Sequence, residues 1–478
     1  MTIQSPAAAN LVEAPRPGAR LQRIDAFLAR VGDTLLRRRN VIQAVQWMVV
    51  AVYLVLITVP ALMPLPARAA HIWNDLTLFA QFVFWGLWWP FVLLSMVLVG
   101  RAWCGLLCPE GTLTQFASRH GQGHALPHWI MWKGWPFVAF AMTTIYGQLI
   151  SVYQYPAPAL LILGGSTAAA LAIGYLYGRN KRVWCRYLCP VTGVFGLLTK
   201  LAPLHFRVDH DVWDASRAAR TGRRTVNCAP LVPIKTMQGS SLCQMCGQCS
   251  GFRGAIALSR RSPNDEIVRV AKDDPKPWET ALILFGLMGV AAGAFHWTGS
   301  DVFVETKQAI ATWLVDHGMM WPLAGHVPWF LLTNYPDNND VLTPLDGALI
   351  VGYIAAVAVL IGLTTSACLA LAARVLGPWH SARFHHLAQG LLPIAGCGVF
   401  LGLSALTVTM LRTEGFALGF VTPLRVAFLA GAALWSCVLC WQIAGAHTQS
   451  RLRQVMATLP SAAAIAVGVA TWALLFWG

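Results

Sequence analysis

The sequence predicts an all-α, polytopic membrane protein with about nine transmembrane helices, because charge is scarce and apolar stretches of membrane-spanning length recur. Of the 478 residues, 56% are hydrophobic and 12% are charged, whereas a soluble domain is typically about 25% charged. A helix needs about 20 apolar residues to span a bilayer. Charge-poor stretches of this size lie at roughly 41–63, 78–99, 133–153, 157–178, 278–297, 346–371, 386–411, 424–445 and 459–477. Backbone polar groups must be hydrogen-bonded within lipid, so we expect each stretch to be helical.

The basic residues predict how these helices are oriented. They gather in alternate connecting segments, at Arg37, Arg38, Arg39, Arg101, Arg179, Lys181, Arg182, Arg374, Arg383, Arg451 and Arg453. Because Lys and Arg are enriched on the cytoplasmic side of membrane proteins, we expect the N-terminus in the cytoplasm and the C-terminus outside. This distribution accounts for the net charge of +15, and nucleic acid is not expected as a partner.

Two cysteine motifs mark an internal duplication in the first half of the chain. The second predicted span is followed by Trp103-Cys104-Gly-Leu-Leu-Cys108-Pro109, and the fourth by Trp184-Cys185-Arg-Tyr-Leu-Cys189-Pro190. Both have the pattern W-C-x-x-L-C-P, and a Gly-Arg pair precedes each, at Gly100-Arg101 and Gly178-Arg179. A helical hairpin plus motif that occurs twice indicates a duplicated unit.

These features divide the chain into four parts. We predict a cytoplasmic tail over 1–40, two duplicated hairpins over 41–200, a cytoplasmic ferredoxin-like segment over 201–277, and a five-helix half over 278–478 with an external loop over 298–344. The amphipathic stretch near 21–36 indicates a helix on the membrane surface. No predicted span carries Asp, Glu, Lys or Arg at its centre, which disfavours a pump or an ion-coupled transporter.

The ferredoxin-like segment holds Cys243, Cys246 and Cys249 in the spacing C-x2-C-x2-C. Three thiolates at this spacing form the core of the bacterial ferredoxin motif, which binds a [4Fe–4S] cluster. Arg253 stands where that motif has its next cysteine, and Cys228 is the simplest fourth ligand. Zinc is the alternative metal, and one of the repeated cysteines is the alternative fourth ligand.

The paired cysteines Cys104/Cys108 and Cys185/Cys189 leave their chemistry open. Residues four apart on a helix share a face, so each pair presents two thiols side by side. If the repeats pack together, four thiolates meet and suit a second cluster, a zinc or copper site, or a redox dithiol. Structural disulfides are not expected in the reducing cytoplasm. Four further cysteines lie within predicted spans and are interpreted as small buried hydrophobes: Cys368, Cys397, Cys437 and Cys440.

The repeated W-C-x-x-L-C-P motif, followed by a cytoplasmic cysteine cluster, resembles the NapH/NosR-type membrane ferredoxins over about 80–260. That group includes quinol-oxidising components of periplasmic nitrate reduction, the membrane factor of nitrous oxide reduction, and the polyferredoxin-like subunit of ferrous-iron uptake systems built around an FTR-type permease. The resemblance implies an electron carrier of the bacterial inner membrane with [4Fe–4S] clusters. The chain departs from NapH-like members in its single incomplete ferredoxin motif, and from NosR-like members in lacking a flavin domain before the first span. Its added five-span half favours the iron-uptake type.

Electron transfer from a cytoplasmic cluster to an external partner must cross a hydrocarbon core of about 30 Å, so a second cofactor or a quinone is expected. A haem b needs two histidines at similar depth on facing helices, and the candidates are His385 or His386 with His447. Histidines at helix ends are otherwise interfacial. The external loop holds His317 and His326 near two methionines; this set suits copper, while the neighbouring tryptophans indicate membrane anchoring.

Together these features predict a subunit that passes electrons between a cytoplasmic or quinone pool and a periplasmic redox or metal-binding protein. A membrane permease is a further partner if the iron-uptake resemblance holds. No nucleophile, general base or substrate pocket is legible, which favours a component over a free-standing enzyme. Two other functions stay open: a quinol dehydrogenase of a periplasmic reductase pathway, and a copper or iron assembly or transport factor.

Overall fold

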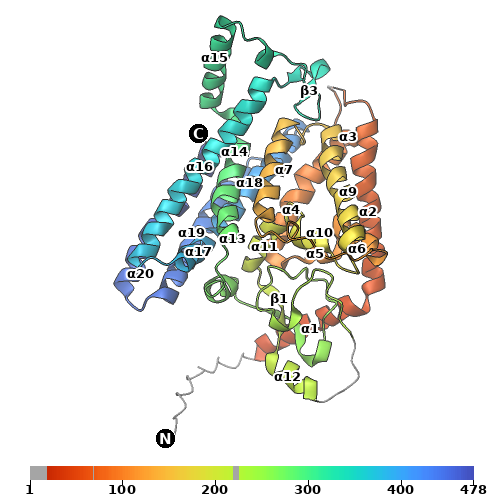
Figure 1. Cartoon of the computed structure of the whole chain (residues 1–478), viewed down its shortest axis with the longest axis vertical. Helices are drawn as coiled ribbons and strands as arrows, with labels where there is room; N and C mark the ends of the chain where they lie inside the picture. Colours follow the sequence, from red (N-terminus) through yellow and green to blue (C-terminus); the bar gives the residue numbers. More distant parts are fainter. Residues whose placement is uncertain (1–18, 68, 219–224, 478) are drawn as a thin grey trace.

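The computed structural model describes residues 19–67, 69–218 and 225–477, and it is mostly helical. Long helices stand side by side, and a small, largely irregular segment lies beneath their lower end, where β1, α1 and α12 are labelled (Figure 1). Within the described residues, eight helical stretches are long and apolar enough to cross a membrane. They are Arg39–Leu62, Leu76–Val99, Pro156–Tyr177, Pro277–Gly299, Pro344–Val375, Leu392–Thr413, Val421–His447 and Arg451–Trp477.

The first half contains the duplicated hairpins. Its long elements are α2 (Arg39–Leu62), the continuous run α3–η1–α4 (Leu76–Gln81, Phe82–Trp88, Trp89–Val99), α7 (Trp135–Leu149), and the run α8–η2–α9 (Pro156–Ala159, Leu160–Gly164, Gly165–Tyr177). Short helices follow each hairpin, namely α5 (Ala102–Leu106), α6 (Pro109–Arg119), α10 (Val183–Tyr187), α11 (Thr192–Leu198) and η3 (Thr199–Leu201). Both η1 and η2 are π-helical, a local winding that is frequent at functional sites. The duplication therefore extends to the shape of the helix before each motif.

The third predicted span, 133–153, is shorter in the structure than expected. Helix α7 has 15 residues, or about 22 Å at 1.5 Å per residue. It nevertheless runs from one end of the bundle to the other. Trp132, just before it, packs against Trp278 at the start of α13, and the Leu149 carbonyl at its far end accepts from the Thr333 N–H of the external loop. The other eight predicted spans match the candidate helices.

The second half begins with the continuous run α13–η7–α14 (Pro277–Ala281, Leu282–Val290, Ala291–His296) and ends with α20 (Arg451–Trp477). Between them lie α16 (Pro344–Val375), α17 (Ser381–Gln389), α18 (Leu392–Thr413) and α19 (Val421–His447). The predicted external loop contains a helix and a small hairpin: α15 (Asp301–Asp316), β3 (Asn334–Tyr335) and β4 (Asp340–Val341). One hydrophobic core includes Val92 and Met96 of the first half with Leu287 and Leu439 of the second, so the two halves are packed together.

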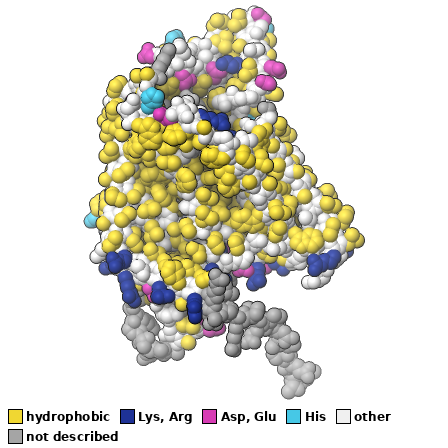
Figure 2. All heavy atoms as spheres, turned by 180° about the vertical axis from the view of Figure 1, so that it is seen from behind, with side chains coloured by type: hydrophobic (Ala, Val, Ile, Leu, Met, Phe, Trp, Pro, Cys, Tyr) yellow, Lys and Arg dark blue, Asp and Glu magenta, His cyan; other side chains and the backbone are white. Residues whose placement is uncertain are grey.

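The outer surface of the bundle is largely apolar. Figure 2 shows a broad hydrophobic belt, with Lys and Arg side chains gathered along its lower edge. A belt of this kind is the surface that lipid covers, and basic residues at one edge are typical of the cytoplasmic side. The multi-pass arrangement is thus supported, and the orientation stays a prediction.

The lower segment has its own core. Strands β1 (Leu204–Val208) and β2 (Ile256–Arg260) pair antiparallel, and α12 (His210–Ala218) lies beside them. Short turns complete it at η4 (Ile234–Thr236), η5 (Phe252–Gly254) and η6 (Glu266–Val270). Helix α1 (Ala19–Arg37) packs on this core through Leu28 and Val31. Part of the apolar face of the amphipathic stretch therefore covers the ferredoxin-like segment, while Ile24 and Phe27 are exposed; contact of this helix with the membrane surface stays a prediction.

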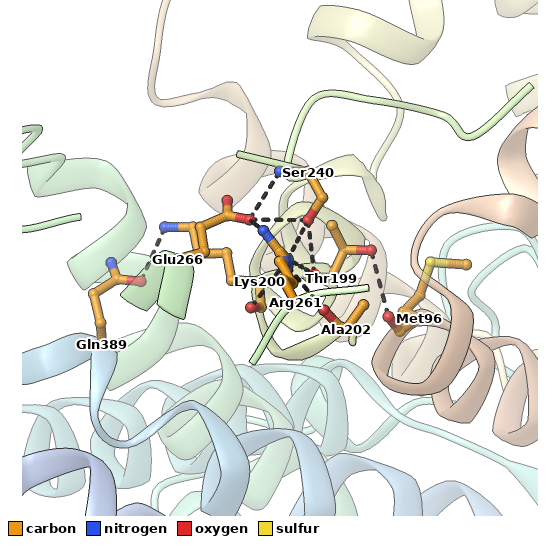
Figure 3. Close-up of polar contacts among 8 residues, drawn as sticks. All are labelled: Met96, Thr199, Lys200, Ala202, Ser240, Arg261, Glu266 and Gln389. Carbon is orange, nitrogen blue, oxygen red and sulfur yellow. Dashed lines mark hydrogen bonds and ion pairs between the residues drawn. The ribbon is translucent and has the colours of Figure 1, made fainter. Parts of the chain in front are cut away.

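A buried polar network fixes the lower segment to the bundle (Figure 3). Arg261 pairs with Glu266 and donates to the Thr199 carbonyl at 3.0 Å. Lys200 donates to Glu279 of α13 at 2.5 Å and to Gln389 of α17 at 2.9 Å. Because the two cations face two carboxylates, this network is balanced in charge.

Candidate functional site

The repeat cysteines, Cys104, Cys108, Cys185 and Cys189, come together in the structure. Cys104 and Cys185 lie in the one-turn helices α5 and α10, and Cys108 and Cys189 follow the ends of these turns. Pro109 then begins α6, with Cys108 as its N-cap residue. All four line one cavity of about 580 Å³ between the two hairpins. The repeats therefore pack together, and the two cysteine pairs meet at one cavity.

Burial and mutual repulsion govern the charge state of these thiols. Burial raises the pKa of Cys185 to about 11. It also raises the pKa of Cys108 and Cys189, which other thiolates of the group raise further. Glu110 lies in the same cavity, and burial raises the pKa of its carboxyl too. Free thiols are therefore favoured here, and a bound metal would have to displace their protons.

The loop cysteines, Cys228, Cys243, Cys246 and Cys249, form a second group in the lower segment. All four line one small pocket, which apolar side chains of the lower core complete. The loop turns sharply at Met245 and Gly247, whose φ angles are +53° and +72°. The Met245 N–H donates to Cys243 Sγ at 3.4 Å, and Cys228 lies where the sequence predicted the fourth ligand.

The loop thiols are also buried. Burial raises the pKa of Cys243 to about 12 and raises the pKa of Cys228 and Cys249. Arg253 occupies the position of the missing ferredoxin cysteine, but its guanidinium lies over the Trp213 ring at 5.0 Å. That arginine therefore packs on an aromatic side chain.

The two cysteine groups are in direct backbone contact. Gly105, next to Cys104, packs so closely on the loop that a Cβ atom there would lie 2.0 Å from the Gln244 carbonyl oxygen and 2.9 Å from the Cys246 nitrogen. Glycine is the residue that allows backbones to approach this closely. Only one layer of backbone therefore separates a repeat cysteine from a loop cysteine.

Two arginines lie at this contact, Arg101 of the first Gly-Arg pair and Arg182, whose equivalence to Arg101 was not recognised in the sequence. Arg101 donates to the Ser241 carbonyl at 3.0 Å, and Arg182 donates to the Cys104 carbonyl and to Gln244 Oε1, each at 2.9 Å. Both stand three residues before the first cysteine of their motif. The equivalent pair is therefore Arg101 and Arg182, and the matching Gly-Arg pairs of the sequence drew attention to Arg179 instead. The signal was present as R-x-W-C in both repeats.

The histidines considered as metal ligands lie in two separate places in the structure. His386 Nδ1 and His447 Nε2 are 2.8 Å apart and hydrogen-bonded, and His386 Nε2 donates to the Ile267 carbonyl. The two rings contact each other in this structure, and haem b stays a prediction. His317 of the external loop stacks on Trp313, with ring centroids 4.2 Å apart.

The cysteines within the membrane spans are packed as predicted. Cys440 is fully buried in the main core, and Cys368, Cys397 and Cys437 pack against it. In the part of the chain that the structure describes, no three or more His, Cys, Asp or Glu side chains are arranged to hold a metal ion. A four-iron cluster differs from a single ion here, because each of its four thiolates binds a different iron.

Comparison with known proteins bears on the repeat cysteines. The family described as a 4Fe–4S binding domain matches residues 81–126 and 160–208, which include all four of them. Residues 209–277, with the loop cysteines, lie outside the match. The chain is also 22% identical over 235 residues to the "Putative electron transport protein YccM" of Escherichia coli (strain K12). That similarity covers 44% of this chain and 64% of the relative, just under two thirds of its length.

No solved structure matches the chain. Neither comparison supports the predicted role in ferrous-iron uptake. What the findings do support is a mostly helical protein with eight candidate membrane-spanning helices and a 4Fe–4S binding domain region over the duplicated motifs.

Proposed function

We propose that this chain is a membrane electron carrier with two iron–sulfur centres. The repeat cysteines would hold one [4Fe–4S] cluster and the loop cysteines a second. Such clusters accept and release single electrons at potentials set by charge, hydrogen bonds and burial. The observation that carries the proposal is the backbone contact at Gly105, which places two groups of four cysteines side by side.

The chemistry of both groups suits a cluster. Each is a set of four thiols, and four cysteine thiolates are the usual ligands of a [4Fe–4S] cluster. Backbone N–H groups point at sulfur in both, from Gly111 to Cys108 Sγ and from Met245 to Cys243 Sγ, each at 3.4 Å. Hydrogen bonds to cluster sulfurs are one means of setting the potential. The family match over the repeats supports the same assignment.

The large cavity favours a second, more specific function, the oxidation of a membrane quinol. Aromatic side chains line it, including Trp85, Trp89, Trp103 and Tyr153, and it reaches the repeat cysteines. Pockets of this size with an apolar lining and few polar groups suit a small ring-shaped ligand. Met142 lines the cavity and is 65% exposed, which is compatible with entry of a lipid-soluble molecule beside this residue.

The cavity also addresses how electrons cross the membrane. Its lining extends from Cys104 at the lower end to Tyr146, whose hydroxyl donates to the Phe330 carbonyl of the external loop. A mobile carrier in the cavity would thus connect the cysteine groups with the outer half of the bundle. We therefore propose a periplasmic redox protein as the partner at the outer end, and a role of the NapH/NosR type for the chain.

The first experiment measures iron and acid-labile sulfide in anaerobically purified protein, with EPR of the reduced state. Two variants, Cys104→Ala/Cys185→Ala and Cys243→Ala/Cys246→Ala, should each lose one EPR signal and retain the other. The matched control is Cys437→Ala/Cys440→Ala, which has the same C-x2-C spacing inside the bundle and should retain both. Absence of iron and sulfide from the native protein would refute the proposal, and a different bound metal would favour the assembly-factor alternative.

A separate variant tests quinol oxidation. Gly165 lines the cavity, and nothing lies within 4 Å of a Cβ atom built there. Gly165→Leu should fill the cavity, abolishing cluster reduction by a short-chain ubiquinol while leaving reduction by dithionite unchanged. Equal reduction by the quinol in the native protein and Gly165→Leu would exclude this cavity as the quinol site.

A further inference from the structure

Arg101 and Arg182 make equivalent contacts across the duplication. Each caps a one-turn helix that carries the first cysteine of its motif, and each reaches into the other repeat. Arg101 Nη2 donates to Thr192 Oγ1 at 3.0 Å, and the Arg182 guanidinium donates to Gln115 Oε1. Thr192 in turn donates to the Cys185 carbonyl at 2.8 Å. The two arginines therefore bind the repeats to one another around the thiols.

Both guanidinium groups are buried without a carboxylate. Arg101 is 5% exposed and Arg182 is 4% exposed. Their hydrogen-bond acceptors are carbonyl, hydroxyl and amide oxygens, and none of the ion pairs among the described residues includes either arginine. The Nε atom of Arg101 is buried and has no hydrogen-bond partner in that part of the chain.

Other buried cations of this chain are paired with carboxylates, and Figure 3 shows one of these pairs, Arg261 with Glu266. Arg261 faces Glu266, and Lys200 faces Glu279. Glu110 is the acidic group that shares a cavity with the thiols and with Arg101. Its hydrogen-bonding partners, however, are Trp184 and Ser166, and burial raises the pKa of its carboxyl. The chain thus pairs buried cations elsewhere and leaves Arg101 and Arg182 unpaired beside the cysteines.

An unpaired buried charge costs several kcal/mol, roughly, unless an opposite charge lies close by. Thiolates and the clusters they hold are anionic. The arginines touch both cysteine groups, since Arg182 binds the Cys104 carbonyl and Arg101 binds the Ser241 carbonyl of the loop. We propose that Arg101 and Arg182 are fixed counter-charges for both centres, and that they raise the reduction potential of the clusters. This inference rests on the proposed iron–sulfur function.

The effect of the two arginines on the pKa of the thiols agrees with a role as counter-charges. Burial raises the pKa of Cys185, and the charges of Arg182 and Arg101 oppose that rise. Burial raises the pKa of Cys243 as well, and Arg101 again opposes it. One guanidinium therefore acts on a member of each group.

Reduction adds one electron to a cluster and breaks no bond, so the site gains one negative charge. Removing a fixed positive charge should destabilise the reduced form more than the oxidised form. Arg101→Gln and Arg182→Gln should each lower the equilibrium ratio of reduced to oxidised cluster at least tenfold. For a one-electron couple a tenfold change corresponds to about 59 mV. Arg101→Lys and Arg182→Lys keep the charge and should stay within about threefold of the native ratio.

The test is an EPR-monitored redox titration of anaerobically purified, full-length protein in detergent, with iron content measured on the same samples. Arg261→Gln is the matched control, because it removes a buried arginine from the balanced network. It should reduce stability with little effect on either midpoint potential. Lower potentials in the glutamine variants, restored by lysine, would support the proposal.

Three results would overturn it: native potentials in iron-loaded Arg101→Gln and Arg182→Gln, lysine variants that fall as far as the glutamine variants, or loss of iron from lysine and glutamine variants alike. The last result would mean that the hydrogen-bond geometry matters and the charge does not. Iron loss confined to the glutamine variants would support the proposal. A native protein without iron would refute the proposed function before any variant is compared, so the two failures are distinguishable.

Discussion

Replacing Gly105 by alanine should separate the two cysteine groups. The added Cβ atom would lie 2.0 Å from the Gln244 carbonyl oxygen, and real Cβ contacts are essentially never closer than 3.0 Å. The loop and helix α5 must therefore move apart by about 1 Å. The atoms in the way belong to the backbone of Gln244 and Cys246, so a side-chain rotation cannot relieve the overlap.

The cost can be set from comparable changes. Adding a methyl group to a well-packed interior typically costs about 1–3 kcal/mol. We expect Gly105→Ala to lower the free energy of unfolding by an amount in the upper part of that range. Backbone strain adds nothing, because glycine at this position has no left-handed φ angle. We expect the interaction between the two clusters to change more clearly than the free energy of unfolding, since the displacement falls between the two proposed centres.

The assay is the magnetic interaction between the two reduced clusters, which is seen as splitting or broadening of the EPR spectrum and weakens with distance. Gly431→Ala is the matched control, because a Cβ atom at Gly431 of α19 would meet nothing within 4 Å. The reasoning is refuted if Gly105→Ala keeps the native splitting, iron content and unfolding midpoint.

Three further outcomes are expected. Cys440→Ala should keep native iron content, because this thiol belongs to the main core; a loss of iron measured with a colorimetric chelator would contradict that assignment. Gly247 has φ +72°, and a Cβ atom there would lie 2.6 Å from the Cβ of Leu35 in α1. Gly247→Ala should therefore push α1 away, expose the loop cluster to oxygen and speed its bleaching in air. An unchanged bleaching rate would contradict the covering role of α1. Burial raises the pKa of the Glu266 carboxyl, but Arg261, Lys200 and the Ser240 N–H together lower it further, so the net pKa lies below the ordinary value of 4.5. The stabilising contribution of Glu266 should be complete above pH 4.5 and lost as pH falls through the folded pKa. Glu266→Gln should therefore flatten the acid side of a plot of melting temperature against pH. An unchanged slope would count against a stabilising Arg261–Glu266 pair.

The membrane helices were predictable because composition alone determines them. A charge-poor stretch of sufficient length has no stable alternative to a helix in lipid, and eight of the predicted stretches match helices of the structure. The remaining predicted span, 133–153, is longer than the helix, since the apolar stretch does not show where the helix ends. The chain leaves α7 after Leu149, where Ser151 takes a φ of +50° and the Val152 N–H bonds to the Gly147 carbonyl.

The site was predictable in its residues and less so in its contacts. Spacing identified the repeat cysteines and the loop cysteines, and the structure gathers each set around one pocket. The contact at Gly105 could not be inferred, because it joins backbones that lie far apart in sequence. The hydrogen bond between His386 and His447 could not be inferred either, because matching depth does not distinguish two rings that bind one iron from two rings that bind each other.

The spacing C-x2-C-x2-C was the stronger signal in the sequence, yet the lower segment depends on the repeats for its shape. Its backbone carbonyls are held by donors from the second repeat: the Arg182 N–H bonds to the Ala229 carbonyl at 2.7 Å, and Lys181 donates to the Cys228 carbonyl at 3.2 Å. Arg101 of the first repeat holds the Ser241 carbonyl. The duplicated hairpins are therefore a platform on which the loop cysteines are arranged. Unfolding of the hairpins should disturb both centres, whereas unfolding of the loop should leave the repeat cysteines in place.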